Sequence, residues 1–247
     1  MFQDFLKPLY KDLQKIVTDT LFPVSCFSCE KEGSFLCTKC QDKLEPVEFQ
    51  ICIICKKPSL GGITHPKCFS PHSPDQLISV YNYHNKLVED LVIKGKYYFI
   101  KDIFTLLGKL MAQKIKTDFP NLLNTQHLAL SPVPLNKWRL RWRGFNQSEL
   151  TSEAIAQELN LPIINALIRN KITRTQKDLK KEDRLKNMES AFTLSPLSLE
   201  GEGLRVRGKS FILIDDVTTT GSTLLEASKV LKRNGAEKVI CLTVARD

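Results

Sequence analysis

The feature that most constrains the fold is a short apolar run that ends in two acids and a hydroxyl-rich turn. Residues 211–214 are Phe-Ile-Leu-Ile, without polar alternation, which is typical of a parallel strand covered on both faces. Asp215 and Asp216 follow at the carboxyl end of that strand, where open α/β sheets bind ligands. Residues 222–234 have the pattern of a helix that ends at Asn234-Gly235. The segment therefore predicts a strand, a ligand-binding turn and a helix.

The turn itself suits a phosphate group. After Val217 it consists of Thr218, Thr219, Thr220, Gly221, Ser222 and Thr223. Backbone N–H groups of such a turn and the N-terminus of the following helix bind anions, and a glycine lets the backbone approach closely. Two adjacent acids beside it can hold a sugar diol or a Mg²⁺ ion. A plain strand-to-helix turn needs one capping hydroxyl and no paired acids, and a Walker A loop would end in Gly-Lys-Ser/Thr, which is absent here.

Apolar periodicity extends this pattern over residues 77–247. Strands are predicted at 77–81, 128–133, 211–214 and 238–244, and helices at 101–116, 148–159 and 222–234. Strands that alternate with helices indicate a parallel sheet flanked by helices, so the fold class is α/β. The Ser-, Gly-, Glu- and Arg-rich stretch 195–208 is expected to be a surface loop.

Seven of the eight cysteines lie between Cys26 and Cys68. They form two sets at zinc-ribbon spacing, Cys26, Cys29, Cys37 and Cys40, then Cys52, Cys55, His65 and Cys68. Each set predicts one structural Zn²⁺ with all four positions filled; an iron–sulfur cluster or inert thiols are the alternatives. The eighth, Cys241, lies in a predicted strand and is expected in the core.

These signals divide the chain into three parts: an N-terminal helix over 1–21, a double zinc ribbon over 22–72 and an α/β domain over 77–247. No apolar run is long enough to span a membrane, and the N-terminus has no secretory pattern, so a cytoplasmic location is expected. Thirty-six basic and 27 acidic residues give a net charge of +9, which suits a polyanionic ligand or a lysine-rich surface equally.

Residues 215–223 resemble the phosphoribosyl-pyrophosphate signature of type I phosphoribosyltransferases. Further segments extend the likeness in order along the chain, at 131–135, 141–147, 174–176, Arg184, Asn187 and 191–192. Together with the cysteine region they resemble the ComF family, a competence-associated group with an N-terminal zinc module on a phosphoribosyltransferase-like domain. The insert around 195–208 is longer than the family pattern.

The resemblance implies the roles of particular residues. Asp215 and Asp216 would be the catalytic residues and would hold the ribose hydroxyls of phosphoribosyl pyrophosphate, with Mg²⁺, while 217–223 would hold its 5-phosphate. The turn at Val133, Pro134 and Leu135, with Arg143, would bind the pyrophosphate, and a basic lid over 171–187 would carry Arg174, Gln176 and Arg184. Thr219 stands where purine-salvage members have an acid, so a purine acceptor is not expected.

Three functions remain open at this point. The first is a catalytic phosphoribosyltransferase of unknown acceptor, acting in DNA uptake or nucleotide metabolism. The second is a non-catalytic sensor of phosphoribosyl pyrophosphate or a nucleotide. The third is a single-stranded DNA-binding protein, because residues 137–143 alternate indoles with cations. Against that third function, Trp138 and Trp142 are four residues apart, a spacing that favours packing of a helical turn onto the core.

Overall fold

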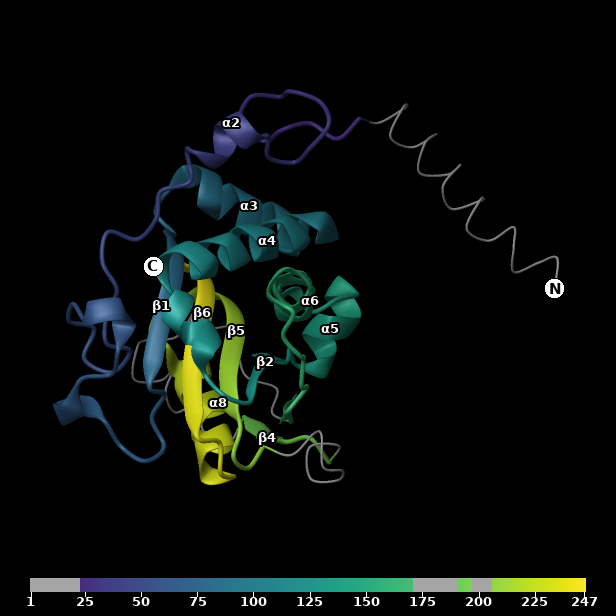
Figure 1. Ribbon diagram of the computed structural model, residues 1–247. Helices are drawn as coiled ribbons and strands as arrows, with labels where there is room; N and C mark the ends of the chain where they lie inside the picture. Colours follow the sequence, from purple (N-terminus) through teal and green to yellow (C-terminus); the bar gives the residue numbers. More distant parts are fainter. Residues whose placement is uncertain (1–22, 171–190, 197–205) are drawn as a thin grey trace. The chain divides into compact units, whose positions relative to one another are not determined.

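The computed structural model describes residues 23–170, 191–196 and 206–247, which fall into two compact units, Met1–Leu44 and Glu45–Asp247 (Figure 1). In the described part of the first unit, helix α2 (Thr38–Gln41) follows a loop in which the rings of Phe27 and Phe35 stack 5.5 Å apart. The helix expected over 1–21 and the lid expected over 171–187 lie outside the described residues.

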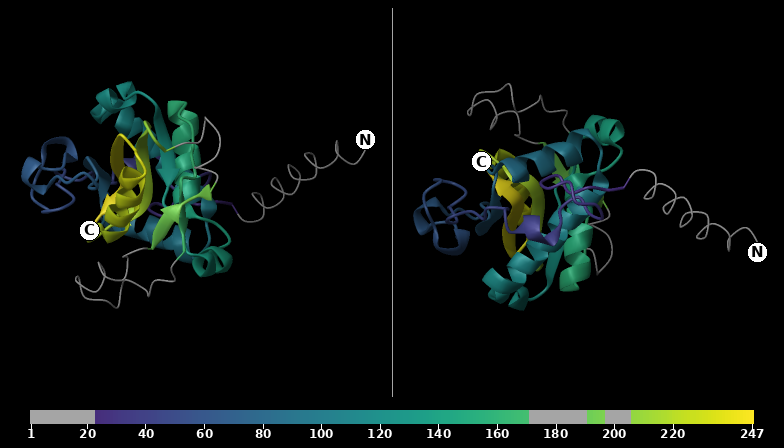
Figure 2. Two further views of the ribbon diagram at one scale, coloured as in Figure 1. Left: turned by 90° about the horizontal axis from the view of Figure 1, so that it is seen from below. Right: turned by 90° about the horizontal axis from the view of Figure 1, so that it is seen from above.

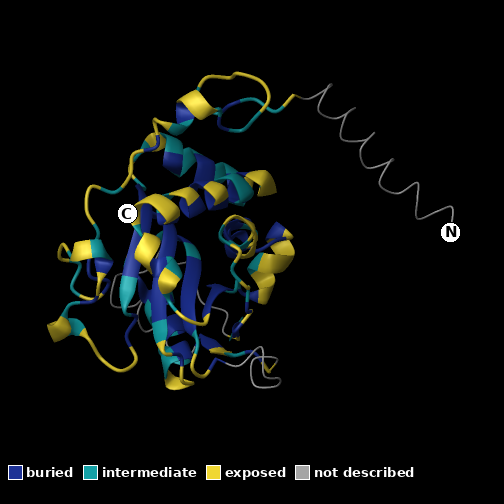
Figure 3. Cartoon of the chain, in the orientation of Figure 1, coloured by how far each residue is buried: buried dark blue, intermediate teal, exposed yellow. Residues whose placement is uncertain are grey.

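A four-stranded parallel sheet organises the second unit and confirms the α/β fold. In sheet order the strands are β1 (Gln76–Asn82), β6 (Lys238–Arg246), β5 (Ser210–Thr218) and β2 (Leu128–Pro132), as Figure 1 shows. All three pairings are parallel. Nearly every residue of β5 and β6 is buried, which explains why the apolar runs of these strands lack polar alternation (Figure 3).

Helices cover both faces of the sheet. They are α3 (Lys86–Tyr97), α4 (Lys101–Asp118), α5 (Lys137–Arg143), α6 (Gln147–Leu159) and α8 (Ser222–Arg233), seen from two more sides in Figure 2. Phe211 and Leu213 of β5 share a core cluster with Leu224 and Leu231 of α8. Because strand side chains alternate between faces, the intervening residues of β5 point to the opposite face, where α6 contacts the strand.

Helix α4 has the apolar stripe that its sequence predicted. Its six inward positions are all buried: Ile103, Phe104, Leu107, Leu110, Met111 and Ile115. It packs closely on α6, since a Cβ at Gly108 would stand 2.7 Å from the Cβ of Ala154 and 2.7 Å from the carbonyl oxygen of Thr151. On α6 this contact is made by Thr151 and Ala154; Ile155 is fully buried, whereas Leu150 and Leu159 are only partly buried.

The second half of the cysteine region covers the edge strand β1. The amide of Gln50 pairs with Ser79, donating to its carbonyl at 2.9 Å and accepting from its N–H at 3.0 Å. Ile63 forms an antiparallel bridge with Gln76, and short 3-10 helices stand at Leu60–Gly62 and Pro66–Cys68. The boundary between the two compact units therefore falls inside the expected 22–72 module. The second half of that module belongs to the unit with the sheet, because an open sheet edge needs hydrogen-bonding partners and this segment provides them.

Several elements were not expected from the sequence. They are α3, α5, a 3-10 helix at Pro120–Asn124 and the antiparallel pair β3 (Leu167–Arg169) with β4 (Phe192–Leu194). Helix α5 begins after Asn136, whose side chain accepts from the N–H of Arg139 at 2.7 Å, and ends at Gly144 in the left-handed region. Both α5 and β3 place basic residues near the end of β5, as the next subsection describes.

Candidate phosphoribosyl-ligand site and metal centres

Asp216 stands at the centre of a buried polar network. Its Oδ2 atom accepts a hydrogen bond from Gln147 Nε2 at 2.8 Å and forms an ion pair with Lys96 Nζ at 2.7 Å. Its Oδ1 atom accepts from the backbone N–H of Val217 at 2.6 Å. Both carboxylate oxygens therefore have partners from α3, α6 and the strand itself, which fixes the orientation of the side chain.

Arg143 continues this network through Gln147. The guanidinium of Arg143 donates to Oε1 of Gln147, so one amide links a buried arginine to a buried aspartate. Burial lowers the pKa of Arg143, and the negative charge of Asp216 acts in the opposite direction. Its Nε atom is buried and has no hydrogen-bond partner among the described residues. The arginine assigned by resemblance to pyrophosphate is thus linked to the acid at the end of β5, and its Nε is not paired by any of the described residues.

Asp215 has a different environment. Its Oδ1 accepts from the N–H of Asp216 at 2.9 Å, and the hydroxyl of Ser148 lies 3.5 Å away. No hydrogen bond reaches its Oδ2 from the part of the chain that the structure describes. Burial, and then the neighbouring charge of Asp216, raise the pKa of Asp215 to about 7. Among the described residues, Asp215 is therefore the acid whose Oδ2 is without a hydrogen-bond partner, and this oxygen suits a hydroxyl group or a cation.

The turn after β5 offers donors to an anion. Gly221 is the N-cap of α8, in the left-handed region at φ 77°, and no side chain caps the helix there. Within the described ranges, the backbone N–H groups of Thr219, Thr220 and Gly221 have no hydrogen-bond acceptor. The hydroxyl of Thr218 is buried and without a partner among these residues. Unpaired donors around a helix N-terminus are the arrangement that binds a phosphate.

A second buried arginine, Arg169, lies near Asp215 at the end of β3. Burial lowers its pKa to about 10; the charge of nearby Arg139 adds to this effect and that of Asp215 opposes it. Arg139 also lowers the pKa of Arg143, so it lies near both buried arginines, of which Arg143 is close to Asp216 and Arg169 to Asp215. Sequence analysis missed Arg169 and Lys96 because neither stands in a motif, whereas Gln147 belonged to the 141–147 segment without being assigned a role.

The turn after β2 lies beside the end of β5. The N–H of Val133 donates to the carbonyl of Ile214 at 2.9 Å, and Asn146 Nδ2 donates to the carbonyl of Val133 at 3.1 Å. Asn146 also caps α6 by accepting from the N–H of Ser148 at 3.1 Å. The structure thus brings Val133, Pro134 and Leu135 to the carboxyl end of the parallel strands, where the acids also lie. The expected lid residues Arg174, Gln176 and Arg184 lie outside the described residues.

Exposed aromatic side chains form a surface that we call the aromatic platform: Tyr97, Tyr98, Phe99, Trp138 and Trp142. The two indoles stack with centroids 6.3 Å apart and planes 4° apart, and Phe99 meets Trp142 edge-on at 5.2 Å. Trp138 is 63% exposed and Trp142 is 47% exposed. The alternative in which the two indoles pack onto the core is wrong: they lie on α5 and stack on each other at the surface.

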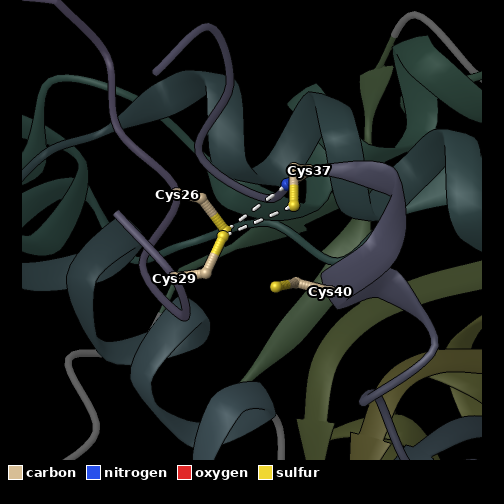
Figure 4. A group of neighbouring side chains, drawn as sticks. All are labelled: Cys26, Cys29, Cys37 and Cys40. Carbon is tan, nitrogen blue, oxygen red and sulfur yellow. Dashed lines mark hydrogen bonds between the residues drawn. The ribbon is translucent and has the colours of Figure 1, made fainter. Parts of the chain in front are cut away.

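In the first unit, Cys26, Cys29, Cys37 and Cys40 form a compact tetrad, with ligand atoms within 4.8 Å of one another (Figure 4). Burial opposes ionisation of Cys26, but backbone N–H groups, that of Cys37 foremost, lower its pKa to about 6. The N–H of Cys37 lies 3.5 Å from the sulfur of Cys26. Sulfurs gathered in this way, with N–H groups directed at one of them, suit a tetrahedral zinc ion bound by thiolates.

The second tetrad belongs to the unit that contains the sheet. Cys52, Cys55, His65 and Cys68 also have ligand atoms within 4.8 Å of one another, and Nδ1 of His65 lies 3.3 Å from the sulfur of Cys55. Burial raises the pKa of Cys52, but N–H groups, that of Cys55 foremost, outweigh it and lower the pKa. The structure therefore groups the eight expected ligands as the spacing predicted.

Two family matches agree with this division. Residues 148–247 match the family described as "Phosphoribosyl transferase domain", and residues 17–69 match "Double zinc ribbon domain". "DNA utilization protein YhgH" of Salmonella typhimurium is 31% identical over 221 residues, which are 83% of this chain and 93% of that protein. The chain belongs to the ComF family.

Other relatives are similar over different shares of the ComF-family chain. "Competence protein ComFC" of Bacillus subtilis is 28% identical over 224 residues, which are 87% of this chain and 86% of that protein. "Competence protein F" of Haemophilus influenzae is 40% identical over 119 residues, or 48% of this chain, and the match spans 50% of that protein. No described helix of the ComF-family chain is long and apolar enough to cross a membrane.

Proposed function

We propose that this ComF-family chain binds phosphoribosyl pyrophosphate with Mg²⁺ and acts as a phosphoribosyltransferase in DNA uptake or utilization. The observation that carries the proposal is the difference between the two acids at the end of β5. Asp216 is neutralised by Lys96 and held by Gln147, while Asp215 keeps an oxygen for a ribose hydroxyl. The process is inferred from relatives named for competence and DNA utilization.

The remaining groups match the other parts of this ligand. The turn 218–223 and the N-terminus of α8 suit the 5-phosphate, since they offer backbone donors without acceptors. Arg143 and Arg169 would face the pyrophosphate, where Mg²⁺ would supply further positive charge against the leaving group. Displacement would occur at the anomeric carbon of the ribose, with pyrophosphate leaving.

Calorimetric titration with phosphoribosyl pyrophosphate, with and without Mg²⁺, tests the proposal. Saturable 1:1 binding that strengthens with Mg²⁺ is expected, because the cation screens the pyrophosphate charge. Release of pyrophosphate on addition of candidate nucleobases or other acceptors distinguishes a transferase from a sensor that only binds. If the chain binds neither phosphoribosyl pyrophosphate nor a nucleotide, both the transferase and the sensor are contradicted.

A second candidate function, single-stranded DNA binding, is favoured by the aromatic platform. Bases stack on exposed aromatic side chains while phosphates meet nearby cations, and Lys137, Arg139 and Arg141 belong to the same helix as the indoles. This platform adjoins the ligand site, since Lys96 of the Asp216 ion pair immediately precedes Tyr97. The chain is therefore expected to bind single strands weakly and with little sequence preference.

Trp138→Ala tests this binding directly. Trp138 is the more exposed indole, so its truncation should weaken binding of a thirty-nucleotide strand at low salt by about 1–3 kcal/mol and leave the fold unchanged. Leu60→Ala, which removes a 91% exposed apolar side chain in the second ribbon, is the control and should have no effect. Affinity should also fall steeply with salt, as phosphate contacts require. If both variants and the parent chain bind the single strand with equal affinity, the role of the aromatic platform in DNA binding is contradicted.

A further inference from the structure

The second zinc tetrad and the phosphate turn are in atomic contact. The tetrad's first knuckle, Cys52–Cys55, contains Ile53 and is followed by Lys56. A Cβ placed on Gly221 would stand 3.1 Å from Cγ1 of Ile53 and 3.1 Å from Nζ of Lys56. At these distances a Cβ would make the side chains of Ile53 and Lys56 shift slightly, and the left-handed backbone at φ 77° also favours glycine. The N-cap of α8 therefore lies directly against residues that the metal ligands hold.

The knuckle determines where Lys56 points. Lys56 adopts the left-handed region at φ 62°, and its N–H donates to the carbonyl of Cys52 at 2.9 Å. The N–H of Cys52 in turn donates to the carbonyl of Lys57 at 3.0 Å. Ile53 is fully buried in the core cluster that includes Leu224 of α8. The backbone hydrogen bonds around Cys52 and the buried side chain of Ile53 therefore hold the backbone of Lys56, from which its side chain extends, in one position.

The ammonium of Lys56 is shielded from solvent although the residue as a whole is only partly buried. A surface lysine normally does the opposite and buries its stem while its charged end stays in water. The charge is felt inside the domain: burial raises the pKa of the Cys241 thiol, and Lys56 acts in the opposite direction. A lysine held in this way brings positive charge to Gly221, next to the donors of the phosphate turn.

We propose that Lys56 is a ligand-binding residue, through which the second zinc knuckle supplies the cation for the 5-phosphate of the ribosyl ligand. Residues 217–223 contain no basic residue, so the turn has donors but no charge of its own to balance a phosphate dianion. A lysine ammonium is a suitable point charge for that purpose. The inference rests on the proposed function and adds a consequence: binding of the 5-phosphate and of the second zinc ion are linked.

Calorimetry with two fragments of the ligand isolates the role of Lys56. Ribose 5-phosphate carries the group in question, while inorganic pyrophosphate reports on the arginine side of the site. Lys56→Gln and Lys56→Met are expected to weaken ribose 5-phosphate binding by about 10- to 100-fold, the usual effect of losing a charged hydrogen bond. Pyrophosphate affinity should not change. Lys57→Gln, which removes the same charge from the exposed neighbour, is the matched control and should leave both affinities unchanged.

Zinc content and zinc release complete the test. Lys56→Met keeps an apolar stem of similar length, so it should retain two zinc ions even if Lys56→Gln does not. Ribose 5-phosphate should slow the loss of one zinc ion to a chelator in the parent chain and have no such effect in Lys56→Met. If the parent chain binds ribose 5-phosphate and Lys56→Met binds it equally well, the role of Lys56 is overturned but the proposed function is not. A parent chain that binds neither ribose 5-phosphate nor phosphoribosyl pyrophosphate overturns the proposed function and this inference with it.

Discussion

A chain carrying Asp215→Asn together with Asp216→Asn is expected to lose measurable binding of phosphoribosyl pyrophosphate while keeping its fold. Hydrogen bonds to charged groups contribute about 1.5–3 kcal/mol each, so two of them correspond to roughly a 100- to 10,000-fold loss of affinity. The fold should persist at lower stability, because the asparagine oxygen can still accept from the N–H of Val217 while its amide nitrogen would face the donors of Gln147 and Lys96. Calorimetry measures the affinity, and thermal melting measures the fold.

The single variants separate the two acids. Asp215→Asn should not lower stability near neutral pH, because burial and the charge of Asp216 already raise the pKa of Asp215 to about 7 and make its ionised form unfavourable. Asp216→Asn should lower stability, because Lys96 loses its ion-pair partner. Asp118→Asn, an exposed acid at the end of α4, serves as the control. Unchanged affinity in the double variant would contradict the assignment of the site.

Metal analysis is expected to find two zinc ions per chain, and the two sites should differ in what they stabilise. Cys26→Ser and Cys52→Ser should each remove one zinc ion. Cys52→Ser should also lower the melting temperature of the sheet-containing unit strongly, because Ile51 and Ile53 beside it are part of that core. Losing a large buried aliphatic side chain from a core costs about 2–5 kcal/mol, and release of this knuckle would remove two such side chains, those of Ile51 and Ile53.

Cys26→Ser should have a much smaller effect on that transition, since its tetrad lies in the separate unit Met1–Leu44. Cys241→Ser, in a buried strand outside both tetrads, controls for loss of a thiol and should leave the zinc content at two. One zinc ion or none in carefully prepared parent protein would contradict the assignment of the tetrads. Equal destabilisation by Cys26→Ser and Cys52→Ser would contradict the proposed difference between them.

Much of the fold could be predicted because its signals are local. The run 211–214 has no polar alternation, which is typical of a parallel strand with both faces covered. Helix α4 follows the 3.6-residue period over five turns, so its buried face was visible in the sequence. Helix α3 was missed although its buried residues Val88, Leu91 and Val92 have helical spacing, and α5 was missed because it exposes its indoles rather than burying them.

By itself, the sequence determined those parts of the site that are contiguous in the chain. The acids, the hydroxyl-rich turn and the cysteine spacing are local patterns, because a strand end, a helix N-terminus and a zinc knuckle are each built within a few residues. Only the tertiary structure decided which distant groups meet them. Lys96, Gln147 and Arg169 converge on the acids from three elements, and Lys56 reaches Gly221 from a metal site 165 positions earlier in the chain. Burial by packing between these elements, together with the charge of Asp216, then raises the pKa of Asp215, which no spacing of residues along the chain specifies.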